Sequence, residues 1–254
     1  MTNPIKIKKN FQKNFLGFSK AKLPDGEGFQ LLKIIKASEL KEKPKQEEIW
    51  DSIANPWKEY RVGIIPIVAE FLKDKNGKVV DLGCGSGRNM LANPNIEYYG
   101  VDFSSVQLKH AEEKAKKEKI NAQLTKSRID KLPMFSDEMF DYGLFVATLH
   151  CLESEEERKN SLLEFYRILK KNAEALITVW NSEDKRFNDV GNRGDIYMSW
   201  KEQEILYMRY YYLYGKEEFI KMLKYAGFEI LEVYEEREGD RFSKKNWIVR
   251  VKKC

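Results

Sequence analysis

Residues 79–87, VVDLGCGSG, give the clearest indication of the fold of this 254-residue chain. An apolar run ends in Asp81, and glycines follow at positions 83, 85 and 87. Such a run is typical of a buried parallel strand, and the glycines let backbone N–H groups approach a ligand at the carboxyl end of the sheet, at the start of a helix. A dinucleotide fingerprint would need its last glycine at position 88, where Arg88 stands. The stretch therefore predicts an α/β fold with a different kind of ligand loop.

The segments around this loop alternate between apolar runs and amphipathic helical patterns. We expect strands at 78–82, 96–102, 141–148 and 173–180 and helices at 104–119, 154–170 and 216–226. This alternation predicts a mainly parallel sheet with helices on both faces. The last two strands, 228–234 and 246–251, are joined by eleven mostly polar residues, which are too few for a helical crossover. The last strand is therefore expected to be antiparallel.

The N-terminal part differs in charge from the rest. Residues 1–45 are predicted to be a basic appendage and residues 46–254 one domain. In the appendage, apolar-rich segments at 15–23 and 29–37 flank the turn sequence PDGEG, which predicts a hairpin. Residues 1–50 carry eleven Lys against six acidic residues, whereas the other 204 residues are neutral overall. This excess either attracts nucleic-acid phosphates or forms a solvated face.

Composition excludes several classes of protein. With 42% hydrophobic and 33% charged residues, the chain is globular rather than disordered. It has no run of about 18 apolar residues, so we expect no transmembrane helix and no membrane partner. The start MTNPIKIKKN has no apolar segment behind it, so a secretory signal is not expected. Three scattered cysteines and two histidines predict neither a disulfide framework nor a metal site, and favour a cytoplasmic setting.

Polar residues at expected strand ends are candidates for the site. Asp102 ends the second strand, where an acid can accept hydrogen bonds from both ribose hydroxyls of a ligand or, alternatively, interact with the helix that follows. His150 lies just past the strand 141–148, where α/β active sites are built, although a lone histidine is often structural. His110 is expected to be exposed on a charged helix face, and the helical pattern of 47–72 is expected to break at Pro56 and Pro66.

The Gly-x-Gly-x-Gly spacing of 83–87 resembles motif I of the Rossmann-like S-adenosylmethionine-dependent methyltransferases. The resemblance implies a Rossmann-like sheet, S-adenosylmethionine as cofactor, and an acid at Asp81 that holds the amino group of its methionine part. The alternative is a tight turn without a ligand. The cofactor-binding residues that we expect are Asp81, Gly83, Cys84, Gly85, Gly87, Asp102, Phe103, Arg128, Ile129 and Val146.

Two further segments resemble motifs of that family. RIDKLP, residues 128–133, is similar to the segment that contacts adenine, but Arg128 stands where an acid is usual and Asp130 comes two places late. We therefore expect adenine contacts from the backbone of Arg128 and Ile129. FVATLH, residues 145–150, is similar to motif IV at the edge of the methyl-transfer site, which implies a functional position for His150.

Three segments point to one acceptor. They are IWDSIA (49–54) with Arg61, ALITVWN (175–181) and YMRYYYLY (207–214), and with the core they make residues 46–254 resemble the tRNA methyltransferases that esterify 5-carboxymethyluridine at the anticodon wobble position. Tyr212 stands where that family usually has histidine, which weakens a proton-transfer role there. The resemblance also implies a tRNA substrate and a small zinc-binding activator subunit that pairs along the sheet edge.

A carboxylate acceptor needs little acid–base help. It is ionised at neutral pH, so the enzyme must align it with the methyl group and the sulfonium, and such alignment can supply up to roughly 7–11 kcal/mol. The arginine fork suits a carboxylate, so Arg61 or Arg209 is expected to position it, with His150 and Trp180 forming the pocket wall. Alternatively, Arg209 binds phosphate or stacks among its tyrosines, and these tyrosines stack on an anticodon base or pack in the core.

Two other functions stay open from the sequence. A small-molecule methyltransferase would use the same cofactor loop, and the basic N-terminal segment and the run 207–214 argue for tRNA instead. A non-catalytic RNA-binding protein would have a decayed cofactor site, whereas Asp81, Asp102 and the three loop glycines are intact.

Overall fold

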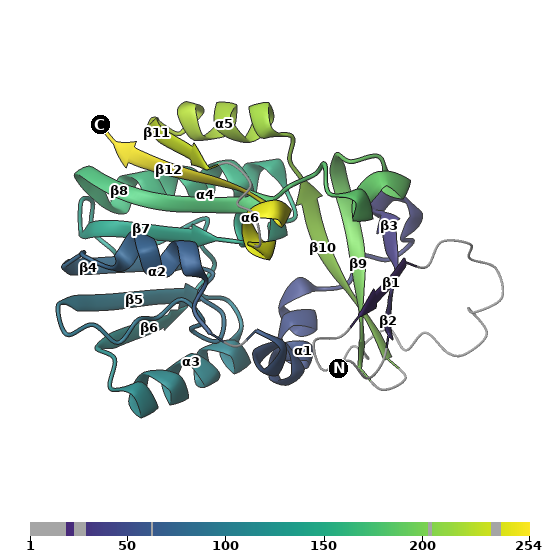
Figure 1. Ribbon diagram of the computed structural model, residues 1–254, viewed down its shortest axis with the longest axis horizontal. Coiled ribbons are helices and arrows are strands. Elements are labelled where there is room, and N and C mark those ends of the chain that lie inside the picture. Colours follow the sequence, from purple (N-terminus) through teal and green to yellow (C-terminus); the bar gives the residue numbers. More distant parts are fainter. Residues whose placement is uncertain (1–18, 23–28, 62, 203–204, 235–239) are drawn as a thin grey trace.

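The main body is a seven-stranded sheet in the order β11-β12-β8-β7-β4-β5-β6 (Figure 1). The computed structural model describes residues 19–22, 29–61, 63–202, 205–234 and 240–254. The sheet strands are β4 (Gly77–Leu82), β5 (Ile96–Asp102), β6 (Ala122–Lys126), β7 (Phe140–Val146), β8 (Leu169–Trp180), β11 (Phe228–Tyr234) and β12 (Asn246–Lys253). Strands β8, β7, β4, β5 and β6 are parallel, and β12 pairs antiparallel with both β8 and β11. This confirms the predicted mainly parallel sheet with an antiparallel last strand.

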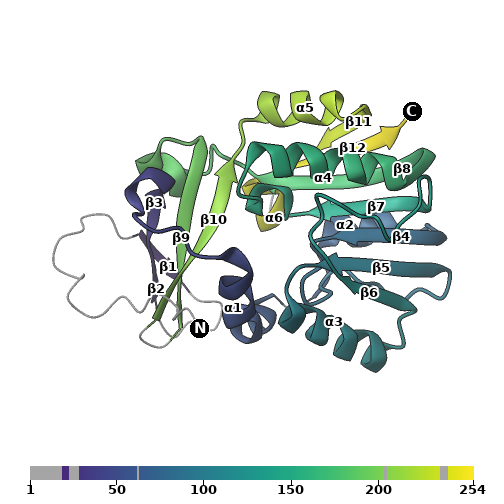
Figure 2. The same ribbon diagram turned by 180° about the vertical axis from the view of Figure 1, so that it is seen from behind.

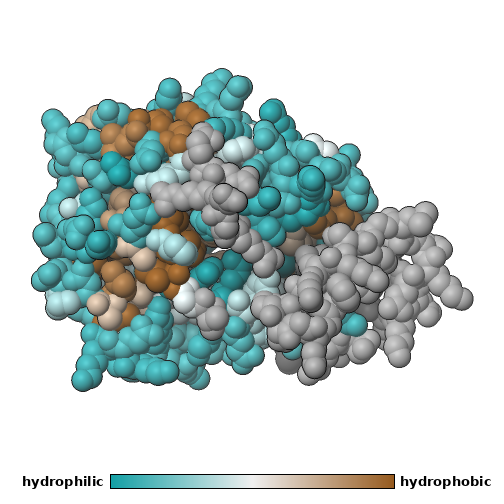
Figure 3. All heavy atoms as spheres, in the orientation of Figure 1, coloured by the Kyte–Doolittle hydropathy of each residue, from teal (hydrophilic) through white to brown (hydrophobic). Residues whose placement is uncertain are grey.

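Helices cover both faces of this sheet, as predicted (Figures 1 and 2). One face packs against α2 (Pro66–Leu72) and α3 (Ser105–Glu118), the other against α4 (Glu155–Ile168) and α5 (Lys216–Tyr225). Side chains alternate between the two faces: in β4, Val79 joins the α2 and α3 cluster and Val80 the other. The space-filling view shows a largely hydrophilic face with apolar patches over this sheet (Figure 3). No helix among the described residues is long and apolar enough to cross a membrane.

The expected helix directly after the glycine loop is absent. All of residues 83–95 are described, and they contain turns but no regular helix between β4 and β5. Gly83, Gly85 and Gly87 have φ values of +72°, +53° and +75°, which are incompatible with a right-handed helix. The loop therefore presents its backbone through successive turns.

A second sheet of three antiparallel strands, β10-β9-β3, stands beside the main one (Figure 1). Its strands are β3 (Ile34–Lys36), β9 (Gly194–Glu202) and β10 (Ile205–Leu213), and β10 carries the tyrosine-rich run. Ile35 pairs with Tyr197, so the end of the segment 1–45 is joined to the rest of the chain. Two further strands, β1 (Ser19–Lys22) and β2 (Phe29–Leu32), pair antiparallel where the sequence predicts a hairpin, whose turn lies outside the described residues.

Helix α1 (Gln46–Tyr60) lies between the two sheets (Figures 1 and 2). Pro56 lies inside this helix and does not end it, contrary to expectation; the buried Ile53 and Ala54 come just before it. The expected break at Pro66 is confirmed, since Pro66 is the first residue of α2, where a missing N–H is harmless. Short helices complete the fold: η2 (Ala37–Glu39), η3 (Leu149–Cys151), η4 (Lys185–Val190) and α6 (Arg241–Lys245).

His110 corrects another expectation. Its side chain is 12% exposed rather than solvated, and its Nε2 lies 2.7 Å from Asn55 Oδ1 on α1. Asp51 of α1 accepts a hydrogen bond of 2.5 Å from Ser104 Oγ, the residue that caps α3. The polar residues around His110 thus form a contact between α1 and α3. The local sequence does not reveal this contact.

Candidate cofactor and acceptor pocket

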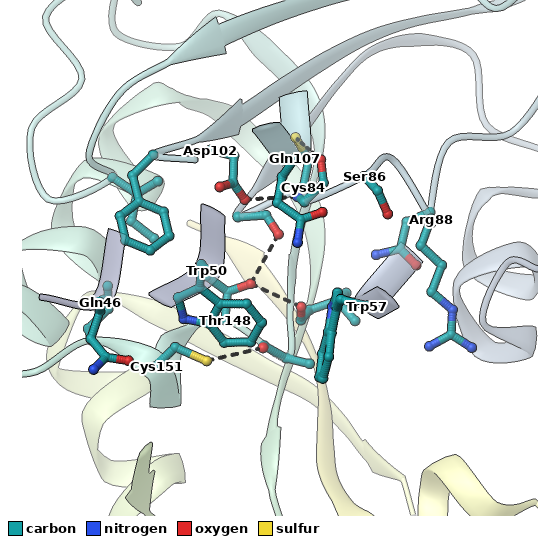
Figure 4. Close-up of a pocket in the computed structure, with 18 of the residues that line it drawn as sticks. Gln46, Trp50, Trp57, Cys84, Ser86, Arg88, Asp102, Gln107, Thr148 and Cys151 are labelled. Atoms are coloured by element: carbon teal, nitrogen blue, oxygen red, sulfur yellow. Dashed lines mark hydrogen bonds between the residues drawn. The ribbon is translucent and has the colours of Figure 1, made fainter. Parts of the chain in front are cut away.

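A pocket opens at the carboxyl ends of β4, β5 and β7, where open α/β sheets bind ligands (Figure 4). Its empty volume is about 1210 Å³, a figure that includes the open space at its mouth. Helix α1 contributes Gln46, Trp50, Trp57 and Arg61 to its wall. The expected cofactor residues on its wall are Gly83, Cys84, Gly85, Asp102, Phe103, Arg128, Ile129 and Val146.

The glycines of the loop have different roles. A Cβ at Gly83 would come within 2.1 Å of Thr148 Cγ2, so this glycine allows the loop to pack on the end of β7. A Cβ at Gly85 would meet only Gln107 Oε1, at 3.9 Å, and would otherwise project into open space. Gly85 therefore leaves a cradle in which a ligand can approach the backbone, and this fits a nucleoside cofactor. Gly87 packs against Met90 and Ala111 behind the pocket.

Asp102 joins the glycine loop to the end of β5. Its Oδ2 accepts a hydrogen bond of 2.8 Å from Gly85 N, and its Oδ1 accepts one of 2.9 Å from Ser104 N. Burial raises the pKa of Asp102 to about 6, so the group is ionised at neutral pH. A carboxylate accepts about four hydrogen bonds in total, and capacity is left for a ribose hydroxyl.

Asp81 lies behind the pocket wall, fully buried. Tyr98 Oη donates a hydrogen bond of 2.5 Å to its Oδ2, whereas its Oδ1 has no partner among the described residues. Burial raises the pKa of Asp81 to about 7, against the opposing effects of hydrogen bonding by the Tyr98 and Asn89 side chains. Oδ1 makes no hydrogen bond of normal geometry with the described residues, and this fits a cationic amino group on a ligand.

Arg128, Ile129 and Asp130 form the wall on the side of α4. Arg128 pairs with Glu157 of α4 and with Asp130, the latter at 3.2 Å. Ile129 is buried and presents an apolar surface suited to a planar base. Two carboxylates therefore hold the Arg128 guanidinium at this wall.

His150 and Trp180 lie in an aromatic stack behind the pocket rather than on its wall. The Trp180 ring stacks on Tyr211 at 3.9 Å, and the His150 ring lies 5.0 Å from Trp180 and 5.6 Å from Tyr211. Burial, together with the positive charges of Arg186 and Arg61, lowers the pKa of His150 to about 3. The imidazole is therefore neutral at physiological pH.

The two candidate arginines occupy different positions. Arg61 lies on the pocket wall with its guanidinium 4.5 Å from the centroid of the Trp57 ring. Arg209 is 3% exposed and does not line the pocket; its Nη2 donates to Ser199 O at 3.2 Å. Its guanidinium lies within 6 Å of four rings, those of Trp50, Trp57, Trp200 and Tyr211. Arg61 can thus contact an acceptor directly, whereas Arg209 supports the aromatic wall.

The pocket contains residues that the sequence reasoning missed. The polar ones include Gln46, Ser86, Asn89, Gln107, Thr148 and Glu153. Phe242 of α6 reaches the same wall from the C-terminal end of the chain. A weak signal existed for Gln107, a polar residue one turn into a helix whose other inward positions are apolar. No cluster of three or more metal-ligating side chains occurs in the part of the chain that the structure describes.

Comparison with known proteins supports this picture. A family model described as a methyltransferase domain matches residues 73–227. The chain is 30% identical over 235 residues to the tRNA (carboxymethyluridine(34)-5-O)-methyltransferase of Schizosaccharomyces pombe, covering 81% of this chain and 95% of that protein. It is also 30% identical to the protein of the same name from Arabidopsis thaliana, covering 61% of this chain and 37% of that protein.

Solved structures share the fold. An S-adenosylmethionine-dependent methyltransferase from Methanosarcina mazei superimposes with a TM-score of 0.62 at 20% identity, covering 76% of this chain and 99% of that one. A Burkholderia thailandensis N1-methyltransferase with bound S-adenosylhomocysteine superimposes with a TM-score of 0.63 at 14% identity, covering 87% of this chain and 95% of that one. At these identities the likeness concerns the fold.

Proposed function

This chain belongs to the methyltransferase-domain family and, within it, to the tRNA (carboxymethyluridine(34)-5-O)-methyltransferases, and from that premise we propose that it methylates the carboxylate of 5-carboxymethyluridine at the tRNA wobble position. One observation carries the proposal. Arg61, held against Trp57, faces the same pocket as the glycine loop and Asp102. A cofactor cradle and a cation suited to a carboxylate thus share one cavity.

The cofactor is S-adenosylmethionine, whose sulfonium supplies the methyl group. The cofactor would lie against the backbone at Gly85. Asp102 would bind its ribose, and Arg128 and Ile129 would contact its adenine. The unpartnered Oδ1 of Asp81 suits its amino group. Phe103 and Val146 would close the apolar part of the same wall.

The chain has to orient the acceptor rather than deprotonate it. Arg61 would grip the carboxylate from one side and present one oxygen for in-line attack. His150 is neutral and buried, so it contributes by fixing Trp180 and Tyr211 in the stack, with Arg209 packed against Tyr211. Each of these groups acts on alignment, and the mechanism includes no proton transfer.

Substrate, partner and setting follow from the same premise. We infer that tRNA docks with its anticodon arm at this pocket, in the cytoplasm. The lysine-rich segment 1–50 would add phosphate contacts. We also infer a small zinc-binding activator subunit that pairs along an edge of the main sheet, whose edge strands are β6 and β11.

The test is mass analysis of wobble nucleosides from cells that lack this protein. We expect the methyl ester of 5-carboxymethyluridine to disappear and the free acid to accumulate. Unchanged ester levels would contradict the proposed acceptor and favour a small-molecule methyltransferase. A protein without affinity for S-adenosylhomocysteine would instead support the non-catalytic alternative.

A further inference from the structure

Gln107 is a buried amide without a partner at the pocket wall. It is 3% exposed, and its Oε1 has no hydrogen-bond partner among the described residues. The side chain lies beside Asp102 and Cys84 and faces the pocket (Figure 4). A buried amide oxygen without a donor costs roughly 1–3 kcal/mol, which calls for a function.

The position of Gln107 is fixed by its surroundings. Its backbone N donates 3.1 Å to Ser104 Oγ, the N-cap of α3, so the residue sits in the first turn of that helix. Its Oε1 lies 3.9 Å from where a Cβ of Gly85 would be. The amide therefore faces the space above Gly85, on the side of the pocket that Asp102 borders.

The amide complements the carboxylate next to it. Ionised Asp102 only accepts hydrogen bonds, and it already accepts two from backbone N–H groups. An amide both donates and accepts, which suits a hydroxyl that does the same. A vicinal diol, the polar edge of a ribose, can bond to an acid through one hydroxyl and to an amide through the other.

We propose that Gln107 binds a ribose hydroxyl of the nucleoside cofactor and shares its diol with Asp102. The inference rests on the cofactor of the proposed function. Gln107 should therefore lower the stability of the unliganded protein, because its side-chain oxygen finds a hydrogen-bond partner only when the ligand is bound. A purely structural glutamine would instead stabilise the unliganded protein.

Titration calorimetry of the full chain tests this with Gln107→Met, which keeps the volume and removes the amide. We expect the affinity for S-adenosylhomocysteine to fall about 2- to 12-fold, the range for one neutral hydrogen bond. The affinity for 5′-methylthioadenosine, which lacks the amino-acid part, should fall by the same factor. Of the 2′-deoxy and 3′-deoxy forms of that ligand, one lacks the hydroxyl that Gln107 binds. Wild type and variant should bind that form equally. Gln123→Met, a change of an exposed glutamine on β6, should alter none of these affinities.

Thermal unfolding without ligand separates the proposed role from a structural one. The melting temperature of Gln107→Met should equal or exceed that of the wild type. Equal binding of S-adenosylhomocysteine by the two proteins, or a deficit that persists with both deoxy ligands, would overturn the inference while leaving the proposed function intact. A wild type that binds none of these ligands would contradict the proposed function itself.

Discussion

Arg61 and Arg209 lie against the same indole ring, that of Trp57, with their guanidinium carbons 4.5 and 5.0 Å from its centroid. Arg61 reaches the pocket and Arg209 is buried behind it. The sequence motif alone leaves the choice between them open. From this arrangement we propose that Arg61 contacts the acceptor directly and that Arg209 supports the aromatic rings around it.

Lysine substitutions separate these two roles. Arg61→Lys keeps the charge and loses the fork, so kcat/KM for tRNA should fall about 10- to 150-fold, as expected when a charged hydrogen bond of about 1.5–3 kcal/mol is removed. Its affinity for S-adenosylhomocysteine should stay unchanged. Arg209→Lys should lower the melting temperature, because lysine cannot stack on the surrounding rings as the buried guanidinium does. A larger loss of kcat/KM in a stably folded Arg209→Lys would reverse the assignment.

Substitution of His150 tests alignment against proton transfer. Because the pKa of His150 is lowered to about 3, rates should not vary with pH through the range 5–8 on its account. His150→Asn keeps a planar hydrogen-bond donor at this position and should be milder than His150→Ala. Initial rates over this pH range provide the measurement. A rate that rises with pH in the wild type and becomes flat in His150→Asn would show a general base.

Asp81 should make the unliganded protein less stable as pH rises. The pKa of Asp81 is raised to about 7 in the folded chain and is near 4 in the unfolded chain. Its contribution to folding stability is therefore fully present below about pH 4 and is lost as the pH rises to 7. The stability of Asp81→Asn relative to wild type should therefore increase across this window, as measured by urea unfolding.

Asp141→Asn is the control with the opposite sign. Asp141 accepts hydrogen bonds from Lys170 Nζ and Lys78 N, and these interactions lower its pKa in the folded chain. Its removal should cost stability above about pH 4 and make little difference below. Parallel pH profiles for the two variants would contradict the assignment for Asp81.

Two truncations test the basic segment. Removal of residues 1–32 takes away six lysines and keeps β3, so the protein should fold and bind cofactor while binding tRNA less tightly. The log–log salt slope should flatten by about 0.7–0.9 for each phosphate that the truncated protein no longer neutralises. Removal of residues 1–45 also deletes β3, which pairs with β9, and should lower the melting temperature. An unchanged salt slope would mark the lysines as a solvated face.

Sequence predicts the main sheet well because its signals are local. The strand that carries Asp81, the capping box of Ser154 and Glu157, and the short connection before β12 each act over a few residues. The second sheet was missed because the tyrosine-rich run fits a strand or a helix, and its pairing with β9 becomes evident only in three dimensions.

The site shows the same division. The positions of the glycine loop and Asp102 in the site can be predicted from their spacing in the sequence. The contributions of α1 and Phe242 to the pocket wall depend on segments that are distant in sequence. Likewise, burial behind the wall separates Arg209 and His150 from Arg61, and no local pattern encodes burial of this kind.

In the proposed reaction the methyl group ends on a carboxylate oxygen. The most direct measurement uses the purified protein, with its activator subunit if required, labelled S-adenosylmethionine, and tRNA from cells lacking this protein. After transfer, the labelled tRNA is treated with mild alkali, which hydrolyses methyl esters and leaves methyl groups on nitrogen, carbon or ribose oxygen. If the methyl group is on a carboxylate oxygen, the label is released as methanol and the wobble nucleoside returns to the free acid. Label that stays on the tRNA after alkali would contradict it.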